Sequence, residues 1–338
     1  MTRLYLLKRK NNMVKEIGRL ASFGIGIEST SGTAVSATNW IPTDDFSLKP
    51  MVEKSKDDNA FGVIDELSGS AIQKESSELT AGGIARSNTI GYLLKLALGT
   101  AGSATLVETG VYSHAFTRLN SNSHPSATVY MNKGNTDERA PYAMVDSLEL
   151  SATLGEFVKF SASMKGGKIE DTTSSPSFLT GTADEAFRAS KVTVKLASDI
   201  SGLGAASAIT LQNIKFSIAK NLNPVFKLGS TALDAQVNQQ FGVTGDFEAI
   251  YDGNTYRDLF TANTKKALQI EIEGATLIGS TKYNKITIQL AQVMLESWDR
   301  STGNNDLVSE TIGFVGEYSF GDTQTINVSL QNTKSANY

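Results

Sequence analysis

The sequence predicts a mainly β fold made of two similar units, each with one short helix. Three observations support this prediction. Apolar and polar residues alternate with a period of two in many short segments, as in strands that bury one face. Two short segments, 90–98 and 256–260, have the apolar spacing of amphipathic helices. The same order of strand-like run, second run and helix occurs in both halves of the chain.

The internal repeat rests on order and spacing. In each half, a strand-like run leads to a second run and then to the short helix. The first pair of runs is centred on Leu48 and Leu79 and the second pair on Phe216 and Phe247, so that the two separations are equal. A repeated β unit with one helix is typical of a building block for a symmetric assembly.

Composition divides the chain into five parts. Gly, Ser and Thr are frequent in residues 13–38, which indicates an extended arm that crosses a surface, and they are frequent again in a candidate linker. Met1 and Met13 are both candidate start positions. The predicted parts are an N-terminal extension (1–38), a first unit (39–168), a linker (169–187), a second unit (188–332) and a C-terminal tail (333–338).

The first unit contains the clearest local predictions. Residues 90–98 place apolar side chains on one helix face. Ser87 or Asn88 is suited to cap the start of this helix, and Gly99 to end it. Residues 145–164 alternate between apolar and polar side chains on both sides of a short turn. This pattern predicts an antiparallel hairpin with one buried face and one polar face.

Two segments are irregular. Residues 49–62 carry charges of both signs and a proline, which predicts either a long exposed loop or an extended hairpin. Such a segment suits contact with a polar partner surface, and a solvated loop is the alternative. In the second unit the alternation slips at Asn213, which indicates a β-bulge.

No catalytic or metal site is predicted. The chain has no cysteine, which excludes disulfides, zinc-thiolate sites, iron–sulfur clusters and thiol catalysis. His114 and His124 lie in a Ser/Asn-rich region and are predicted to be surface or turn residues. The acidic pairs 44–45 and 57–58 would point to opposite faces of a strand, and no Gly-x-Ser-x-Gly motif occurs. The sequence therefore argues against an enzyme, and no cofactor is expected.

Charge and hydropathy exclude two further classes. The net charge is −4, and no concentrated basic face of the kind that a sequence-specific DNA reader carries is evident. Weak acidity suits a surface past which DNA slides without counterion release, and an ordinary solubility charge also accounts for it. No apolar run approaches the roughly 18 residues of a transmembrane helix.

Two glycine-punctuated regions resemble the tail tube proteins of tailed bacteriophages. These regions are GRLASFGIGIES (18–29) with WIP (40–42), and FGVTGDFEA (241–249) with the helix after it. The resemblance covers nearly the whole chain from about Met13, and it is closest to larger members with a duplicated tube domain. The resemblance depends more on the order of elements and on the internal repeat than on any short motif.

The resemblance implies a fold and an assembly. Family members have a β-sandwich-like or partial-barrel domain with a flanking helix, and the inner strands of neighbouring subunits close into a ring-shaped β-barrel. Rings stack into a hollow tube. Most members form hexamers, so a duplicated member would need three copies, as a homotrimeric pseudo-hexamer.

The implied function is that of a structural virion protein. It would be made in the host cytoplasm and assembled into the phage tail, where double-stranded DNA passes through the lumen without sequence-specific binding. The implied partners are further copies of the chain and other tail proteins, namely the tail tip, the terminator and the tape measure. The resemblance implies no membrane span and no cofactor.

The resemblance also implies two sets of site residues. Loop 49–62 would contact the stacked ring, with a less charged counterpart at 219–235; its candidate residues are Lys49, Glu53, Lys54, Lys56, Asp57, Asp58 and Phe61. Hairpin 145–164 would help to line the lumen, with the candidates Ser147, Glu149, Ser151, Lys159, Ser161 and Ser163.

Two other functions are kept as alternatives. One is another phage structural β protein, from the tail tip, the baseplate or a decoration layer. The other is a secreted β-sandwich binding module for carbohydrate. The binding module would need clustered exposed aromatic side chains, whereas Trp40 and Trp298 lie far apart in sequence. An absence of polymerisation would favour either alternative.

Overall fold

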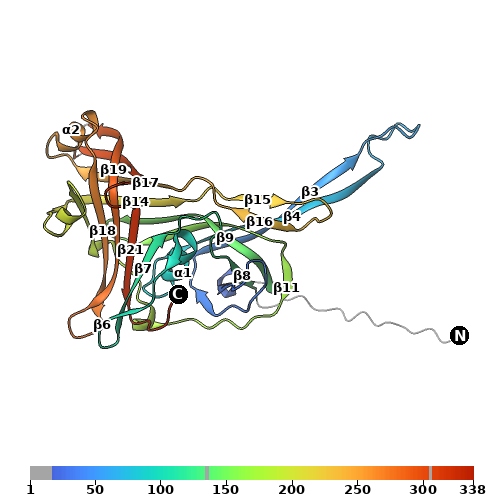
Figure 1. The fold of residues 1–338 in the computed structure, drawn as a ribbon, viewed down its shortest axis with the longest axis horizontal. Helices are drawn as coiled ribbons and strands as arrows, with labels where there is room; N and C mark the ends of the chain where they lie inside the picture. The colour runs from blue at the N-terminus through green and yellow to red at the C-terminus, as the bar shows by residue number, and fades with distance from the viewer. Residues whose placement is uncertain (1–16, 134–136, 304–306) are drawn as a thin grey trace.

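The computed structural model describes residues 17–133, 137–303 and 307–338, and it confirms a mainly β fold (Figure 1). The candidate start positions Met1 and Met13 lie outside the described residues. The two helices are α1 (Ile90–Leu98) and α2 (Thr255–Thr261). Four short 3-10 turns accompany them within the described ranges: η1 (Gly18–Leu20), η2 (Gly181–Asp184), η3 (Ala189–Lys191) and η4 (Ser201–Gly204).

The strands are numbered in chain order. Those of the first half are β1 (Ser22–Ile27), β2 (Asn39–Ile41), β3 (Asp45–Asp57), β4 (Gly69–Ile84), β5 (Gly99–Ala101), β6 (Thr105–Glu108), β7 (Val111–Arg118), β8 (Ala127–Asn132), β9 (Asp137–Thr153), β10 (Lys159–Gly166) and β11 (Glu170–Thr172). Those of the second half are β12 (Val192–Ala197), β13 (Ala208–Ile209), β14 (Leu211–Ala219), β15 (Asn223–Phe226), β16 (Leu233–Val237), β17 (Gly242–Ile250), β18 (Lys266–Leu277), β19 (Tyr283–Ser301), β20 (Ser309–Glu317) and β21 (Ile326–Asn332).

Eight antiparallel strands form a continuous row that spans both halves. Their spatial order is β3-β4-β10-β9-β14-β17-β20-β19. The first four strands belong to the first half and the last four to the second half. The junction between the halves is the direct pairing of β9 with β14, for example Leu150 with Phe216. The two halves therefore share one sheet.

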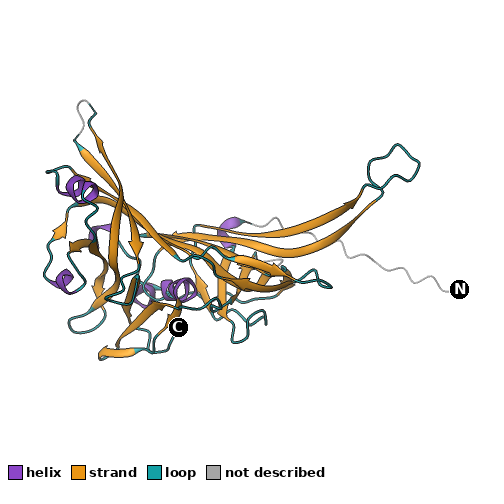
Figure 2. Cartoon of the chain, turned by 45° about the horizontal axis from the view of Figure 1, so that its top comes forward, coloured by secondary structure: helices purple, strands orange, loops and turns teal. Residues whose placement is uncertain are grey.

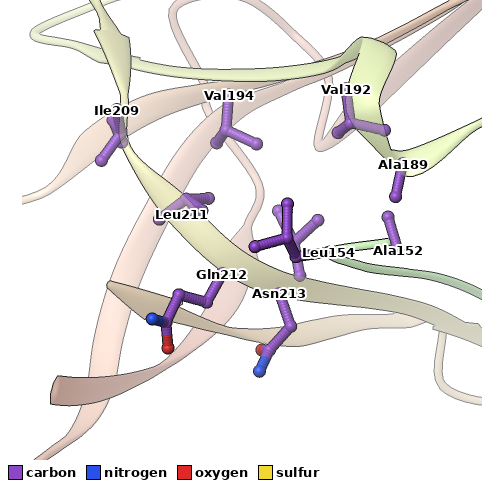
Figure 3. A pocket seen from close by; sticks show the side chains of 10 residues that line it. Ala152, Leu154, Ala189, Val192, Val194, Ile209, Leu211, Gln212 and Asn213 are labelled. Atoms are coloured by element: carbon purple, nitrogen blue, oxygen red, sulfur yellow. The ribbon is translucent and has the colours of Figure 1, made fainter. Parts of the chain in front are cut away.

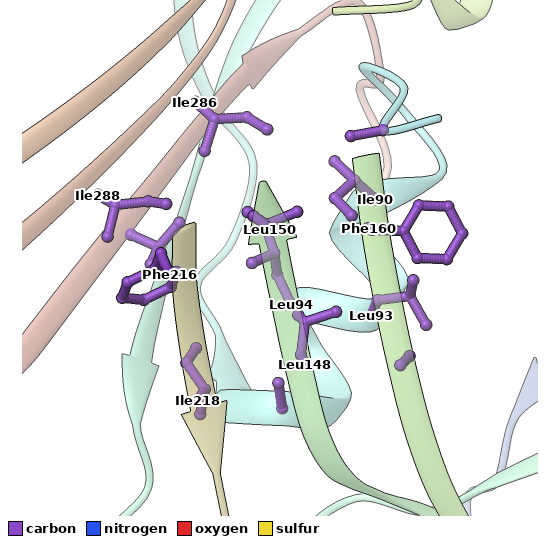
Figure 4. Packing of buried hydrophobic residues seen from close by; sticks show 14 of the residues in the cluster. Ile90, Leu93, Leu94, Leu148, Leu150, Phe160, Phe216, Ile218, Ile286 and Ile288 are labelled. Atoms are coloured by element: carbon purple, nitrogen blue, oxygen red, sulfur yellow. The ribbon is translucent and has the colours of Figure 1, made fainter. Parts of the chain in front are cut away.

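A second layer packs against this row and encloses the core. The first part of β9 pairs with β8 and β11, and the first part of β19 pairs with β18 and β21, so both long strands pass from one layer into the other. Figure 4 shows Leu148 and Leu150 of β9 facing Leu94 of α1, with Phe216 and Ile288 beside them. These side chains are buried because they occupy alternate positions on the inner face of each strand.

The spatial order of strands is the same in both halves. In the first half β3-β4-β10-β9 form the row, and in the second half β14-β17-β20-β19 form it. The second-layer pairings also match: β1 with β2 and β8 in the first half, and β12 with β13 and β18 in the second. One helix follows β4 and one follows β17.

The two predicted pairs of strand-like runs have equal separations in the sequence, but the residues that lie opposite each other in the sheet are not equivalent. Leu48 lies opposite Leu79, whereas Phe216 lies opposite Gly245, and Phe247 lies two residues further along β17, opposite Ile214. The equivalence of the two pairs is therefore wrong by two residues. A period of two defines which face a strand buries, but it leaves the register free to shift by two.

Several local predictions are confirmed. Residues 145–164 form the hairpin β9–β10, and the slip at Asn213 is a register irregularity in β14. Segment 49–62 is the extended hairpin and not the loop, since β3 runs to Asp57 and pairs with β4.

The prediction that residues 13–38 form an arm on the surface is wrong for β1. This strand lies buried between β2 and β8 because its apolar side chains face the core.

Helix α1 begins and ends near its predicted limits, but it is capped by a distant residue. Gly99 has a φ of +92°, the left-handed conformation that ends the helix. At the start, the Asp184 carboxylate accepts the backbone N–H groups of Asn88 (2.8 Å) and Thr89 (3.1 Å) and the Thr89 hydroxyl (3.0 Å). No side chain of Ser87 or Asn88 caps the helix within the described structure.

We expect Asp184→Ala to lower the free energy of unfolding by about 1–3 kcal/mol, because it leaves buried N–H groups without an acceptor. Burial raises the pKa of Asp184, although the N–H donors of Asn88 and Thr89 oppose this shift. Urea denaturation followed by circular dichroism measures the effect. Asp171→Ala, on exposed β11, is the control and should change stability by less than about 0.5 kcal/mol. An equal effect of the two substitutions would contradict the capping role.

The candidate linker and tail are packed against both halves. Next to Asp184, the Glu185 carboxylate accepts the N–H groups of Ala275 and Thr276, both at 2.9 Å, at the end of β18. Phe187 is fully buried. At the other end, the Tyr338 ring packs against Tyr92 and its hydroxyl donates to the Asn88 carbonyl (2.8 Å). Both segments therefore hold α1 against the second half.

The prediction that both histidines lie in surface or turn positions is wrong, because both are buried. His114 is 0% exposed and His124 is 6% exposed. Burial lowers the pKa of His114, and it lowers that of His124 to about 4 with help from the nearby Lys220 charge. The Lys220 side chain is 1% exposed and donates to the Leu96 carbonyl at the end of α1 (2.7 Å).

Lys220 predicts a measurable pH dependence. Burial lowers the pKa of Lys220 to about 7 from an ordinary value of 10.5. Between these values the unfolded chain holds a proton that the folded chain lacks, so stability contributed by this site rises with pH. We expect wild type to gain more stability than Lys220→Met between pH 7 and about pH 9.5. Urea midpoints at both pH values test this, with exposed Lys191→Met as the control; an equal gain in Lys220→Met and wild type would contradict it.

Candidate assembly surfaces

One face of the eight-strand row is polar and accessible to solvent. All six lumen candidates lie on this face, in three directly opposed pairs: Ser147 with Ser163, Glu149 with Ser161, and Ser151 with Lys159. Their neighbours Leu148, Leu150, Phe160 and Ala162 face the core. The structure thus brings the candidates together on two adjacent strands.

The polar face extends across the junction into the second half. Ser217 lies opposite Glu149, and Lys215 lies opposite Ser151. The Lys215 ammonium is 2.9 Å from the Glu149 carboxylate, and this contact raises the pKa of Lys215. Small side chains and charges of both signs therefore cover the face, which has no large apolar patch in this part of the row.

The hairpin β3–β4 extends away from the body as a long arm (Figures 1 and 2). We use the name arm for residues 49–77. Five of the inter-ring candidates lie on β3, and Asp58 and Phe61 lie in the turn beyond it. The Glu53 carboxylate and the Lys74 ammonium, directly opposite each other, are 2.7 Å apart. Lys49, Glu53, Lys54 and Lys56 are exposed.

The end of the arm also carries apolar side chains that the sequence interpretation did not single out, apart from Phe61. In the turn, Ile64 is fully exposed, and Phe61, Val63 and Leu67 are between 45 and 65% exposed. Met51, Val52 and Ile72 are exposed on the strands. The available signal was a cluster of apolar residues within an otherwise polar, charged segment. Exposed apolar side chains gathered on one projection mark a contact surface.

The counterpart of the arm in the second half is the short hairpin β15–β16, within the predicted segment 219–235 and just beyond it. This hairpin braces the base of the arm. The backbone N–H of Glu75 donates to the Thr231 carbonyl (2.8 Å), and the Lys74 ammonium lies over the Phe226 ring. The two hairpins therefore differ in length. The sequence predicted that the second is also less charged than the first.

Both ends of the eight-strand row are available for pairing. Strand β3 pairs with β4 on one side, and no other described strand pairs with its opposite edge. At the far end, residues 294–301 of β19 pair with β20 on one side. Their other side has no partner strand among the described residues, because the pairing of β18 with β19 stops at Val293. An exposed strand edge presents unpaired N–H and C=O groups that favour pairing with another chain.

Two hollows lie at the beginnings of β3 and β14. The one beside β14 has a volume of 60 Å³ and is lined by apolar side chains of β12, β13 and β14 together with Leu154, which follows β9 (Figure 3). The one beside β3 has a volume of 930 Å³, and its lining mixes apolar side chains such as Phe46 and Phe178 with charged ones such as Arg19, Asp44 and Arg86. We call the larger hollow the β3 groove.

The described residues contain no group of three or more His, Asp or Glu side chains placed to bind a metal. None of the helices in the described ranges is long and apolar enough to cross a membrane. The surfaces that stand out are therefore the polar face, the arm and the two strand edges.

A comparison with protein families decides between the possible structural roles. The family described as phage tail tube protein matches residues 18–328, nearly the whole chain. The chain belongs to the phage tail tube protein family. The general role of this family is structural, in the virion tail, and it implies assembly with copies of the chain and with other tail proteins. No curated protein matches the chain.

Proposed function

We propose that three chains form a ring of the tail tube in which the eight-strand rows close into a single β-barrel. Each chain would supply two positions of a pseudo-hexamer. The barrel would remove the exposed strand edges, which otherwise favour uncontrolled pairing. The rings would then stack into the conduit for double-stranded DNA.

The observation that carries this proposal is the repeated strand order. The orders β3-β4-β10-β9 and β14-β17-β20-β19 are identical in topology, and the second-layer pairings match as well. Tandem duplication of a tube domain accounts for this identity. The junction of β9 with β14 then serves as an example, within one chain, of the contact that links neighbouring chains.

The polar face of the row is proposed to line the lumen. A strand in a closed barrel directs alternate side chains to the interior, and the core occupies the other face here. Serines dominate this face, and its lysines Lys215 and Lys159 are each paired with a carboxylate, Glu149 at 2.9 Å and Glu156 at 2.6 Å. Few unpaired cations would therefore face phosphate, so DNA would pass without tight binding. This arrangement supports passage of DNA in preference to its retention.

The arm is proposed to contact the next ring in the stack. A two-stranded hairpin with both faces in water is at best marginally stable, so the arm is expected to gain order from a partner. Its turn residues Phe61, Val63, Ile64 and Leu67 would bury apolar surface there, and its charged strands would meet polar groups.

Negative-stain electron microscopy of the purified protein tests the proposed function. We expect rings or hollow tubes, either spontaneously or after addition of a tail-tip initiator. A protein that stays monomeric under both conditions would contradict the proposal and would favour a decoration or binding role. Single rings without tubes would contradict the stacking role of the arm alone.

A further inference from the structure

A small hollow lies beside the junction between the halves. Beyond the paired part of β9, Leu154 lines this hollow together with Leu211, Ala189 and Val192 (Figure 3), and it remains 70% exposed. The Leu154 N–H donates to the Gln212 carbonyl (3.0 Å). The hollow has a volume of 60 Å³. The chain after β9 is thus held beside the beginning of β14.

The β3 groove is built from the corresponding elements of the first half. The hollow beside β14 is lined by η3, β12, β13 and the beginning of β14, and the groove by η1, β1, β2 and the beginning of β3. In both halves these elements occur in the same chain order and with the same pairings. The groove is larger, with a volume of 930 Å³, and within the described chain β3 has no neighbour in the position that β9 takes beside β14.

We propose that β19 of a second copy of this chain pairs with the free edge of β3 in a defined register, with Leu307 of that copy at the β3 groove. This inference rests on the ring proposed above. The hairpin β19–β20 occupies the same place in the second half as β9–β10 in the first. Leu307, which precedes β20, is 65% exposed and would pack against the apolar part of the groove lining, such as Phe46 and Phe178.

A bulge in each hairpin gives the register. In β9 the pairing shifts at Asp146, between Val145 and Ser147, and in β19 it shifts at Glu296, between Leu295 and Ser297. Aligning the two bulges makes Asp299 equivalent to Glu149. Bulges are local irregularities with a fixed position in a ladder, so they are better markers of register than hydrophobic spacing.

The same alignment finds the partner of Asp299 on β3. In the first half, Leu79 pairs with Met164 on one side and with Leu48 on the other. In the second half, Phe314 is equivalent to Met164, and Gly245 pairs with Phe314 on one side and with Phe216 on the other. Leu48 is therefore equivalent to Phe216, and Lys49 to Ser217. Because Glu149 lies opposite Ser217 within the chain, Asp299 of one copy would lie opposite Lys49 of the next.

Lys49 and Asp299 carry opposite charges, which suits this register. Lys49 and Asp299 are both exposed, and each lies on the polar face of its strand. Opposite charges directly across a strand pair are favourable, and like charges are unfavourable. The equivalent face of the in-chain junction is also bridged by opposite charges, Lys215 and Glu149 at 2.9 Å.

Cysteine pairing tests the register, since the chain contains no cysteine of its own. The full-length variant Lys49→Cys/Asp299→Cys is assembled, oxidised with diamide and separated under denaturing conditions. Directly opposed strand residues lie within the Cα separation that a disulfide allows, about 4.4–6.8 Å. We expect covalent dimers and trimers. The in-chain control Glu149→Cys/Ser217→Cys should form a disulfide within one chain.

A register shifted by two residues provides the matched comparison. Lys49→Cys/Ser297→Cys places the thiols diagonally, at about 7–8 Å, and should cross-link at least fivefold less. Rings that form without a disulfide between positions 49 and 299, or that link better through the shifted pair, would overturn the inference and leave the ring proposal intact. An absence of any ring would overturn both.

Charge reversal gives a second test that needs no disulfide. We expect Lys49→Glu to reduce the fraction of chains in rings at least tenfold, through repulsion from Asp299. The double variant Lys49→Glu/Asp299→Lys should restore that fraction to within twofold of wild type. Failure of the double variant to recover, when both variants fold as judged by circular dichroism, would overturn the proposed pairing.

Discussion

Shortening the arm is expected to abolish tube growth while single rings still form. Glu53 and Lys74 lie directly opposite each other, so residues 54–73 are replaceable by an Asn-Gly turn that suits a two-residue hairpin. The replacement removes the apolar turn but leaves Lys49 and the edge of β3. Negative-stain microscopy and sedimentation measure the lengths of the particles.

The size of this effect follows from the apolar surface of the turn. Burying one side chain such as Phe61 or Ile64 contributes about 1.5–3 kcal/mol, and a tenfold change in affinity requires about 1.4 kcal/mol. Four such side chains per contact would therefore dominate stacking. The control Asp65→Asn/Glu66→Gln keeps the apolar residues and should keep growth within twofold. Tubes of normal length from the shortened variant would contradict the role of the arm.

The second large effect is expected at the junction of the two halves. Phe216 is 2% exposed and lies opposite Leu150 in the shared sheet. We expect Phe216→Ala to lower the free energy of unfolding by about 3–5 kcal/mol, because it leaves a cavity in a closely packed core. Leu228→Ala, on the exposed turn of β15–β16, is the control and should cost less than about 0.5 kcal/mol.

The two tryptophans show whether the halves unfold together. Trp40 reports on the first half and Trp298 on the second, so Trp298→Phe and Trp40→Phe each leave one fluorescent reporter. We expect coincident urea transitions from both reporters, with and without Phe216→Ala, because β9 and β14 join the halves in one sheet. Separate transitions would show that the halves are independent domains.

Local features were predictable because they depend on neighbours in the sequence. Helix α1 follows from apolar spacing and Gly99, and the β9–β10 hairpin from alternation on both sides of a turn. The irregularity at Asn213 was visible as a break in that alternation. The same alternation placed the six lumen candidates on one face, since side-chain direction in a strand depends only on position.

Other features depend on contacts between distant segments. The Asp184 cap comes from a segment that reads as a linker, and no pattern near α1 indicates it. The histidines are buried by chain segments that pack over a Ser/Asn-rich region. The pairing of Phe216 with Gly245 is set by the ladder, which a repeat of apolar spacing does not define. The β3 groove likewise exists only when η1, β1 and Phe178 come together.

The number of chains in one ring tests the central claim most directly. The shortened-arm variant is expected to stop at single rings, whose mass is measurable by native mass spectrometry. If the repeated strand order supplies two positions per chain, the ring contains three chains. A ring of six chains would contradict the pseudo-hexamer, because each chain would then occupy one position.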